Sequence, residues 1–253
     1  MSEEFAARRA RFRALHEAGC FILPNPWDVG SAHRLERMGF KALASTSAGA
    51  AWALGREDGE LSCAEVLAHL RVLVAATSLP VNADFEAGFA DAPDEVAANV
   101  GLAVETGVAG ISIEDRTGTT LYDLSLAVER IRASREAIDL VAPDVLLIGR
   151  TEGYLIGRTT LGPTLERLVA YAKAGAGCVY APGIKDLGAI RELVAEVAPV
   201  PVNVLHRPGL TVADLAAAGA RRVSVGASLA AASWAGFTAA ATALVKEGEA
   251  LPA

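Results

Sequence analysis

Short, nearly continuous apolar runs alternate with longer amphipathic segments along almost the whole chain. Such runs are typical of strands that are buried on both faces of a parallel sheet, because neither face then needs polar side chains. We therefore predict eight strands, within residues 20–25, 41–46, 80–85, 110–115, 145–152, 177–183, 201–205 and 221–226.

The segments between these runs have the character of helices. Ser62 and Thr211 are expected N-caps, and Pro93 and Pro163 fit a first helical turn. Glycines suited to helix C-termini stand at positions 39, 107, 175 and 219. Besides a charged N-terminal helix, we predict helices over residues 30–38, 63–77, 93–106, 124–142, 163–174, 186–197, 212–218 and 228–247.

Alternating strands and helices predict a parallel sheet, and eight units in a chain of 253 residues predict a (β/α)₈ barrel. An open doubly wound sheet is the alternative, but it usually has a glycine-rich loop after its first strand, where this chain has NPWDVGSA. No change of composition marks a linker. We expect a single α/β barrel domain, residues 1–253, with an N-terminal helix and an alanine-rich C-terminal helix.

Composition limits the cellular environment and the binding partners that we expect. Hydrophobic residues make up 52% of the chain, and the net charge of −7 argues against nucleic acid as a partner. The segment 227–245 is the nearest to a membrane span, but Ser, Thr and Gly interrupt it. We expect a buried helix there, packed on its own barrel or on another subunit, and no membrane partner. The three cysteines (Cys20, Cys63, Cys178) are odd in number and lack the spacing of metal ligands, which favours the reducing cytoplasm.

Two of the predicted strands end in carboxylates. Asp84 and Glu86 lie two residues apart in PVNADFEAGF, so a strand would point both the same way. Glu114 and Asp115 end the run GISIED. Carboxylates gathered at strand ends suit a hard cation such as Mg²⁺.

Other predicted strands also end in polar residues, whereas their amino ends show no comparable group of polar side chains. A site at the carboxyl ends of the strands is the usual arrangement in barrel enzymes. The further candidates at these ends are Asn25, Asp28, Ser45, Thr46, Ser47, Arg56, Glu57, Asp58, Arg150, Glu152, Tyr180, Asn203 and His206.

The order of these motifs, from about Pro24 to Gly226, resembles the isocitrate lyase/phosphoenolpyruvate mutase superfamily. The matching motifs are a serine turn followed by Gly-x-x-Asp, then Asp-x-Glu-x-Gly-Phe, Ile-Glu-Asp and Arg-Thr-Glu. The resemblance implies a Mg²⁺- or Mn²⁺-dependent barrel that makes or breaks C–C or P–C bonds beside a 2-oxo or enol carboxylate. It also implies a cytoplasmic homo-oligomer, usually a tetramer, whose final helices pack on a neighbouring subunit.

The resemblance also implies roles for individual residues. Asp84 corresponds to the direct metal ligand, and Glu86 and Glu114 to partners that hold metal-bound waters. Arg150 and Asp58 correspond to catalytic residues, and His206 to a substrate contact or proton donor. The expected substrate-binding residues are Ser45, Thr46, Ser47, Arg150 and Asn203.

One loop departs from the family pattern. The family's lyases carry Lys-Lys-Cys-Gly-His after strand four, and its phosphonate enzymes use Lys with Asn or Thr there, whereas residues 116–125 read RTGTTLYDLS. This loop contains neither the thiol nor the lysine, and because it is short we expect a smaller lid over the site. We therefore expect a lyase or decarboxylase that acts through a stabilised enolate. A phosphonomutase or phosphonopyruvate hydrolase, and a degraded metabolite-binding relative, are the alternatives.

Each candidate residue is also compatible with a plainer role. The carboxylates at the strand ends fit solvated charges or helix caps. Arg150 fits a structural ion pair with Asp84 or Glu152, His206 a loop histidine, and Asp58 a surface loop.

Overall fold

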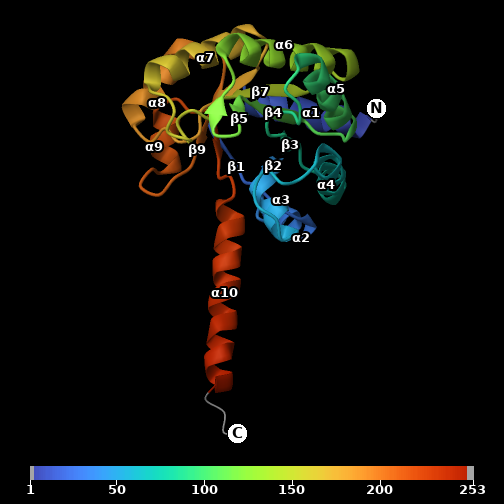
Figure 1. The fold of residues 1–253 in the computed structure, drawn as a ribbon, viewed down its shortest axis with the longest axis vertical. Helices are drawn as coiled ribbons and strands as arrows, with labels where there is room; N and C mark the ends of the chain where they lie inside the picture. The colour runs from blue at the N-terminus through green and yellow to red at the C-terminus, as the bar shows by residue number, and fades with distance from the viewer. Residues whose placement is uncertain (1–2, 250–253) are drawn as a thin grey trace.

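The computed structural model describes residues 3–249 and contains eight parallel strands ringed by helices (Figure 1). Their order is β1-β10-β9-β8-β7-β4-β3-β2. The Ala44 amide donates to the Pro24 carbonyl at 3.0 Å, which links β2 to β1 and nearly closes the ring. The predicted (β/α)₈ barrel is confirmed. The strands are β1 (Phe21–Leu23), β2 (Leu43–Ala44), β3 (Val81–Asp84), β4 (Gly110–Glu114), β7 (Leu146–Arg150), β8 (Cys178–Tyr180), β9 (Val202–Leu205) and β10 (Arg222–Ser224).

The apolar faces of the outer helices pack against the strands and form one hydrophobic core with them. Helix α1 (Glu3–Leu15) instead contributes Phe12 to a smaller hydrophobic cluster, which also contains Ala109 and Leu146 at the amino ends of strands β4 and β7. The other surrounding helices are α2 (Val29–Arg37), α4 (Cys63–Ala76), α5 (Pro93–Glu105), α6 (Leu124–Val141), α7 (Leu161–Lys173), α8 (Leu187–Val197) and α9 (Val212–Ala217).

The predicted start and stop signals of the helices are confirmed. Ser62 and Thr211 form capping boxes at α4 and α9, and Asp28 forms one at α2. The glycines at 39, 107, 175 and 219 have φ of 87°, 93°, 105° and 97°, the left-handed region that glycine enters without a steric penalty. These local signals therefore set where the helices turn back toward the barrel.

Two elements lie where the sequence predicts loops. Helix α3 (Ser47–Ala53) follows β2 directly, capped by Thr46, whose hydroxyl accepts the Gly49 amide at 3.3 Å. It is too short for hydrophobic periodicity to reveal it. A small antiparallel hairpin, β5 (Arg116–Thr117) and β6 (Thr120–Leu121), occupies the expected lid loop. Its turn includes Gly118, with φ of 57°.

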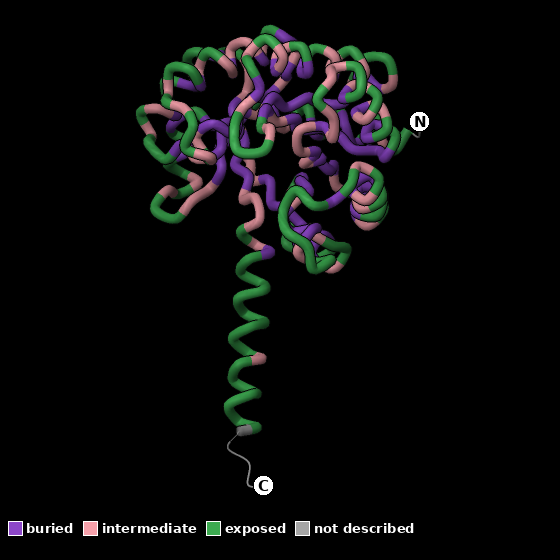
Figure 2. Tube along the Cα trace, in the orientation of Figure 1, coloured by how far each residue is buried: buried purple, intermediate pink, exposed green. Residues whose placement is uncertain are grey.

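The last helix, α10 (Ser228–Glu249), projects away from the barrel, as Figures 1 and 2 show. Phe237 and Leu244 are 65% and 67% exposed, and Ala230, in the first turn, is fully buried. Packing on its own barrel, one of the two expectations, is therefore wrong beyond that first turn. By length and hydropathy, α10 is also the one helix in the described range that would be able to cross a membrane.

We expect α10 to pack on a second copy of the chain. Burying Phe237 and Leu244 in such an interface stabilises it by about 1.5–3 kcal/mol each, so the double variant Phe237→Asp/Leu244→Asp should dissociate into smaller species. Size-exclusion chromatography with light scattering measures the change, and Lys246→Gln is the matched control on the same helix. A monomeric wild type, or a wild type recovered only with membranes, would contradict this expectation.

Candidate active site

The polar residues at the carboxyl ends of the strands surround two adjoining cavities. The larger, about 540 Å³, is lined by Ser45, Asp84, Arg150 and Asn203 among others. The smaller, about 290 Å³, is lined by acidic residues that include Glu86, Glu114 and Glu152. Four residues line both, namely Ser47, Asp58, Arg150 and Leu155. The predicted site residues from strands β2, β3, β4 and β7 therefore do converge.

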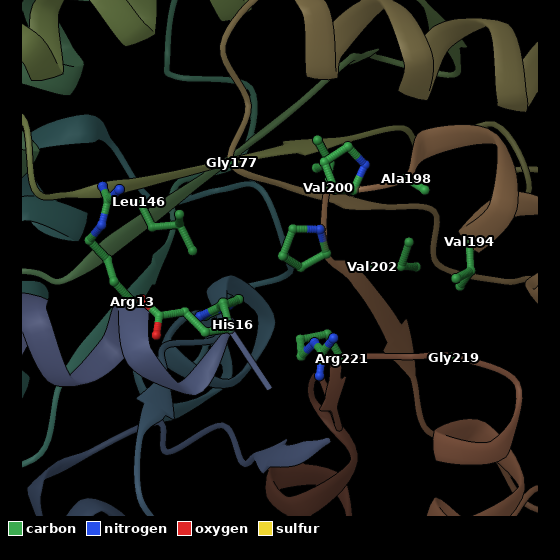
Figure 3. A pocket seen from close by; sticks show the side chains of 13 residues that line it. Arg13, His16, Leu146, Gly177, Val194, Ala198, Val200, Val202, Gly219 and Arg221 are labelled. Atoms are coloured by element: carbon green, nitrogen blue, oxygen red, sulfur yellow. The ribbon is translucent and has the colours of Figure 1, made fainter. Parts of the chain in front are cut away.

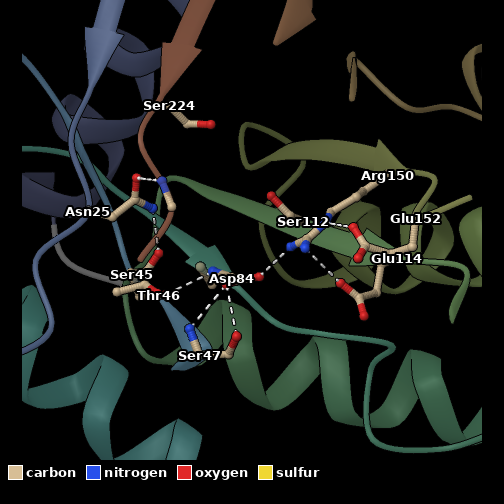
Figure 4. A network of polar contacts seen from close by, with 12 residues as sticks. Asn25, Ser45, Thr46, Ser47, Asp84, Ser112, Glu114, Arg150, Glu152 and Ser224 are labelled. Carbon is tan, nitrogen blue, oxygen red and sulfur yellow. Dashed lines mark hydrogen bonds and ion pairs between the residues drawn. The ribbon is translucent and has the colours of Figure 1, made fainter. Parts of the chain in front are cut away.

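Arg150, the last residue of β7, stands between three carboxylates (Figure 4). Its Nε donates to Glu152 at 2.6 Å, Nη1 to Asp84 at 2.9 Å, and Nη2 lies 3.2 Å from Glu114. The ring of Tyr180 lies 5.5 Å from its guanidinium carbon, within cation–π range. These carboxylates raise the pKa of Arg150, against the lowering effect of burial. Both ion pairs considered from the sequence, with Asp84 and with Glu152, are present.

Asp84 is held by the segment that follows β2. Its Oδ2 accepts the Ser47 amide at 3.1 Å and the Ser47 hydroxyl at 3.2 Å. Its own backbone amide donates to the Ser45 hydroxyl at 2.8 Å. Because Thr46 caps α3, residues 45–47, which are three of the five predicted substrate-binding residues, form a turn held against the predicted metal ligand.

Burial raises the pKa of two carboxyl groups of the site, Glu86 and Glu114. Burial, followed by repulsion from Asp84 and Asp58, raises the pKa of Glu86 to about 7. Burial also raises the pKa of Glu114 to about 8, even though Arg150 opposes the shift. Glu86 sits in the left-handed region with φ of 47°, and its buried Oε1 has no hydrogen-bond partner. A non-glycine residue there is strained, and such strain is common at functional sites.

This donor set fits a hard divalent cation. Carboxylate oxygens are the ligands that Mg²⁺ prefers, and it usually keeps several waters and takes one or two carboxylates. Asp84 and Glu114 share a single arginine, and the buried Oε1 of Glu86 has no hydrogen-bond partner. Within residues 3–249, no three His, Cys, Asp or Glu side chains are arranged to ligate one ion together. A site with one direct carboxylate and others acting through water agrees with both observations.

Sequence reasoning missed the network that supports this cluster. Asp115, only 2% exposed, accepts the Glu152 amide at 2.9 Å and the Tyr171 hydroxyl at 2.6 Å. Arg167 lies 3.2 Å from the same carboxylate. Asp115 thus neither caps a helix nor faces the cavities, but fixes the backbone of Glu152 and so the plane of Arg150. No local motif reveals this, because the partners lie 37 to 56 residues apart.

The remaining candidates lie deeper or at the rim. Asn203 lines the larger cavity. Its Oδ1 accepts a hydrogen bond from Arg222 Nε at 2.9 Å, and its Nδ2 donates one to the Ser224 hydroxyl at 2.9 Å. His206 follows β9, and its backbone amide donates to the Ser224 carbonyl at 2.8 Å. It is not among the side chains that line the larger cavity, whereas its neighbour Arg207 is. The roles assigned to Asn203 and His206 stay predictions.

A further cavity, about 670 Å³, opens at the other end of the barrel (Figure 3). It is lined by Arg13, His16 and Arg221, together with the amino ends of the strands. Burial and nearby Arg222 lower the pKa of His16 to about 3, so this imidazole is neutral at physiological pH. The acidic cluster is remote from this end, and catalytic residues of barrel enzymes come from the opposite one. We therefore place the candidate site in the first two cavities.

Comparison with known proteins identifies the family of the chain. The family model described as phosphoenolpyruvate phosphomutase matches residues 12–245. A crystal structure of a putative lyase/mutase from Burkholderia cenocepacia J2315 is 45% identical, covers 97% of this chain and 91% of that one, and superposes with a TM-score of 0.94.

Curated relatives agree as well. An uncharacterized protein of Mycobacterium tuberculosis is 36% identical over 245 residues, 95% of this chain and 91% of the relative. The 2-methylisocitrate lyase of Escherichia coli is 30% identical over 187 residues, 69% of this chain and 62% of that enzyme. With a barrel whose acidic motifs meet around Arg150, the chain belongs to the isocitrate lyase/phosphoenolpyruvate mutase superfamily, a group of lyases and mutases.

Proposed function

We propose that this protein is a cytoplasmic, Mg²⁺-dependent lyase or decarboxylase that acts on small 2-oxo or 2-hydroxy mono- or dicarboxylates. The observation that carries the proposal is Arg150, set among Asp84, Glu114 and Glu152 at the mouth of a cavity. A guanidinium beside carboxylates that hold a metal suits a reaction in which negative charge grows on a substrate oxygen during bond cleavage. Mn²⁺ is the alternative metal.

Each side chain has a part in this proposal. Asp84 would hold the metal directly, with Glu86, Glu114 and Asp58 around its waters. A bound Mg²⁺ supplies Lewis-acid stabilisation of negative charge developing on oxygen. Arg150 orients the substrate carboxylate, because its Nε is fixed by Glu152 and its planar fork suits a carboxylate. The turn at residues 45–47 bounds the cavity where the second carboxylate would lie.

The absence of a thiol at the site supports decarboxylation or related enolate chemistry over the thiol-dependent cleavages of the family. Cys178 is fully buried in β8, and burial raises its thiol pKa. Cys63 begins α4, and Cys20 precedes β1 at the amino end of the barrel. None of the three lines either cavity of the candidate site. The hairpin β5–β6 also brings neither lysine nor asparagine, which disfavours the phosphonate reactions.

A substrate panel tests the proposal. We expect purified protein with Mg²⁺ to convert oxaloacetate or a related 2-oxo or 2-hydroxy acid, followed by coupled assay of pyruvate and of other keto-acid products. Chelation by EDTA should abolish turnover, and added Mg²⁺ should restore it. Conversion of phosphonopyruvate, followed by ³¹P NMR, would instead favour the mutase or hydrolase. Binding of such acids without turnover of any would favour a degraded, metabolite-binding relative.

A further inference from the structure

A third cavity at the carboxyl ends of the strands, about 490 Å³, adjoins the larger cavity of the site. Leu155, Arg207 and Pro208 line both this cavity and the larger cavity of the candidate site. A ligand bound at Arg150 is therefore able to extend past these three residues without leaving the protein surface. The remaining lining comes from Tyr154, Gly183 and Lys185.

The wall of this third cavity depends on a close approach between two loops. Gly183 follows β8, with φ of 101°, and a Cβ built there would lie 3.0 Å from the backbone of Tyr154 and of Leu155. Any side chain at 183 would therefore push away the loop that follows β7. The glycine lets the loops after β7 and β8 meet and form one continuous rim beside Lys185.

Two cations on this rim lack ionic partners. Neither Arg207 nor Lys185 forms an ion pair with any residue between 3 and 249, whereas Arg150 contacts three carboxylates. The Nε of Arg207 is buried and has no hydrogen-bond partner. Leaving a donor of a partly buried guanidinium without an acceptor costs free energy, and a bound anion would supply that acceptor.

The charges of the site are also segregated by strand. Asp84, Glu86 and Glu114 lie at the ends of β3 and β4, Arg150 and Glu152 lie at the end of β7, and the two unpaired cations follow β8 and β9. A molecule reaching from the acidic side across Arg150 would therefore meet positive charge at its far end. The neutral fragment between its two ends would contact Leu155 and Pro208.

We propose that Arg207 and Lys185 form a second anion subsite, which selects substrates carrying a further carboxylate or phosphate beyond the acid end held at Arg150. This inference rests on the proposed function, since it takes Arg150 as the anchor of the substrate. Arg207 is here a specificity-determining residue, while the reacting atoms stay at Arg150 and the acidic cluster.

Binding of unreactive acids tests the subsite without requiring turnover. Isothermal titration calorimetry with Mg²⁺ present would compare oxalate, the shortest of the three acids, with tricarballylate and 3-phosphoglycerate. We expect Arg207→Gln to weaken binding of at least one longer acid about ten-fold and to change oxalate affinity less than two-fold. Arg207→Lys should retain part of the preference. Lys173→Gln, an exposed cation on α7, is the matched control, and thermal melts check folding.

The outcomes separate the subsite from the proposed function. If oxalate binds but the longer acids bind no tighter to wild type, the subsite is wrong and the proposed function stands. If Arg207→Gln weakens oxalate and the longer acids equally, selection at Arg207 is also wrong. If oxalate fails to bind while a longer acid binds in an Arg207-dependent way, Arg207 binds anions but the anchor at Arg150, and with it the proposed function, is wrong. The longer acid that loses more affinity identifies carboxylate or phosphate.

Discussion

Asp84→Ala is expected to remove detectable Mg²⁺ binding and to lower kcat/KM about 10²–10³-fold, the usual cost of losing charge stabilisation at a reacting oxygen. Asp84 is the carboxylate that both the turn at 45–47 and Arg150 orient. Without it, Glu86 and Glu114 have no fixed partner through which to hold a hydrated ion. Calorimetric titration with Mg²⁺ and steady-state kinetics on the best substrate of the panel measure the two effects.

The matched control for this variant is Glu129→Gln, which removes an exposed carboxylate on α6. It should leave Mg²⁺ affinity and kinetics unchanged. Unaltered metal binding in Asp84→Ala would show that the ion, if any, sits elsewhere, and the assignment of the acidic cluster would have to be abandoned.

Arg150→Gln is expected to destabilise the metal-free protein by about 3–5 kcal/mol, because removing one partner of a buried ion pair leaves uncompensated charge. Asp84 and Glu152 would lose their shared cation, and Arg150 is only 17% exposed. For a chain of this size, the change corresponds to a fall in Tm of about 6–20 °C. Differential scanning calorimetry in EDTA measures the shift.

Mg²⁺ should restore more stability to Arg150→Gln than to wild type, since the added positive charge compensates the stranded carboxylates. Arg158→Gln, an exposed arginine in the following loop, serves as control and should melt like wild type. A Tm of Arg150→Gln within about two degrees of wild type would mean that the carboxylates are already neutralised by protons or water. The charge balance described for the site would then be wrong.

Much of the candidate site follows from short-range rules. Asp84 and Glu86 are close in sequence, and the ends of neighbouring parallel strands meet in space, so their approach to Glu114 was predictable. Arg150 was predictable for the same reason. The order of the strands required only the alternation of strands and helices, because β–helix–β connections are almost always right-handed.

Other features depend on partners distant in sequence. The role of Asp115 requires Tyr171 and Arg167, and the contrast between His206 and Arg207 depends on which way one loop turns. The small helix α3 is stabilised where it lies on the barrel, since its buried alanines carry almost no periodic signal of their own.

Sequence by itself determined the barrel, the helix boundaries and the end of the barrel that carries the acids, because periodicity, caps and strand ends are encoded by near neighbours. Tertiary structure decided that one arginine is shared by three carboxylates, that two rim cations stay unpaired, and that α10 leaves its own barrel. These features are balances of charge and burial between segments far apart in the chain, and only the folded arrangement sets the distances on which they depend.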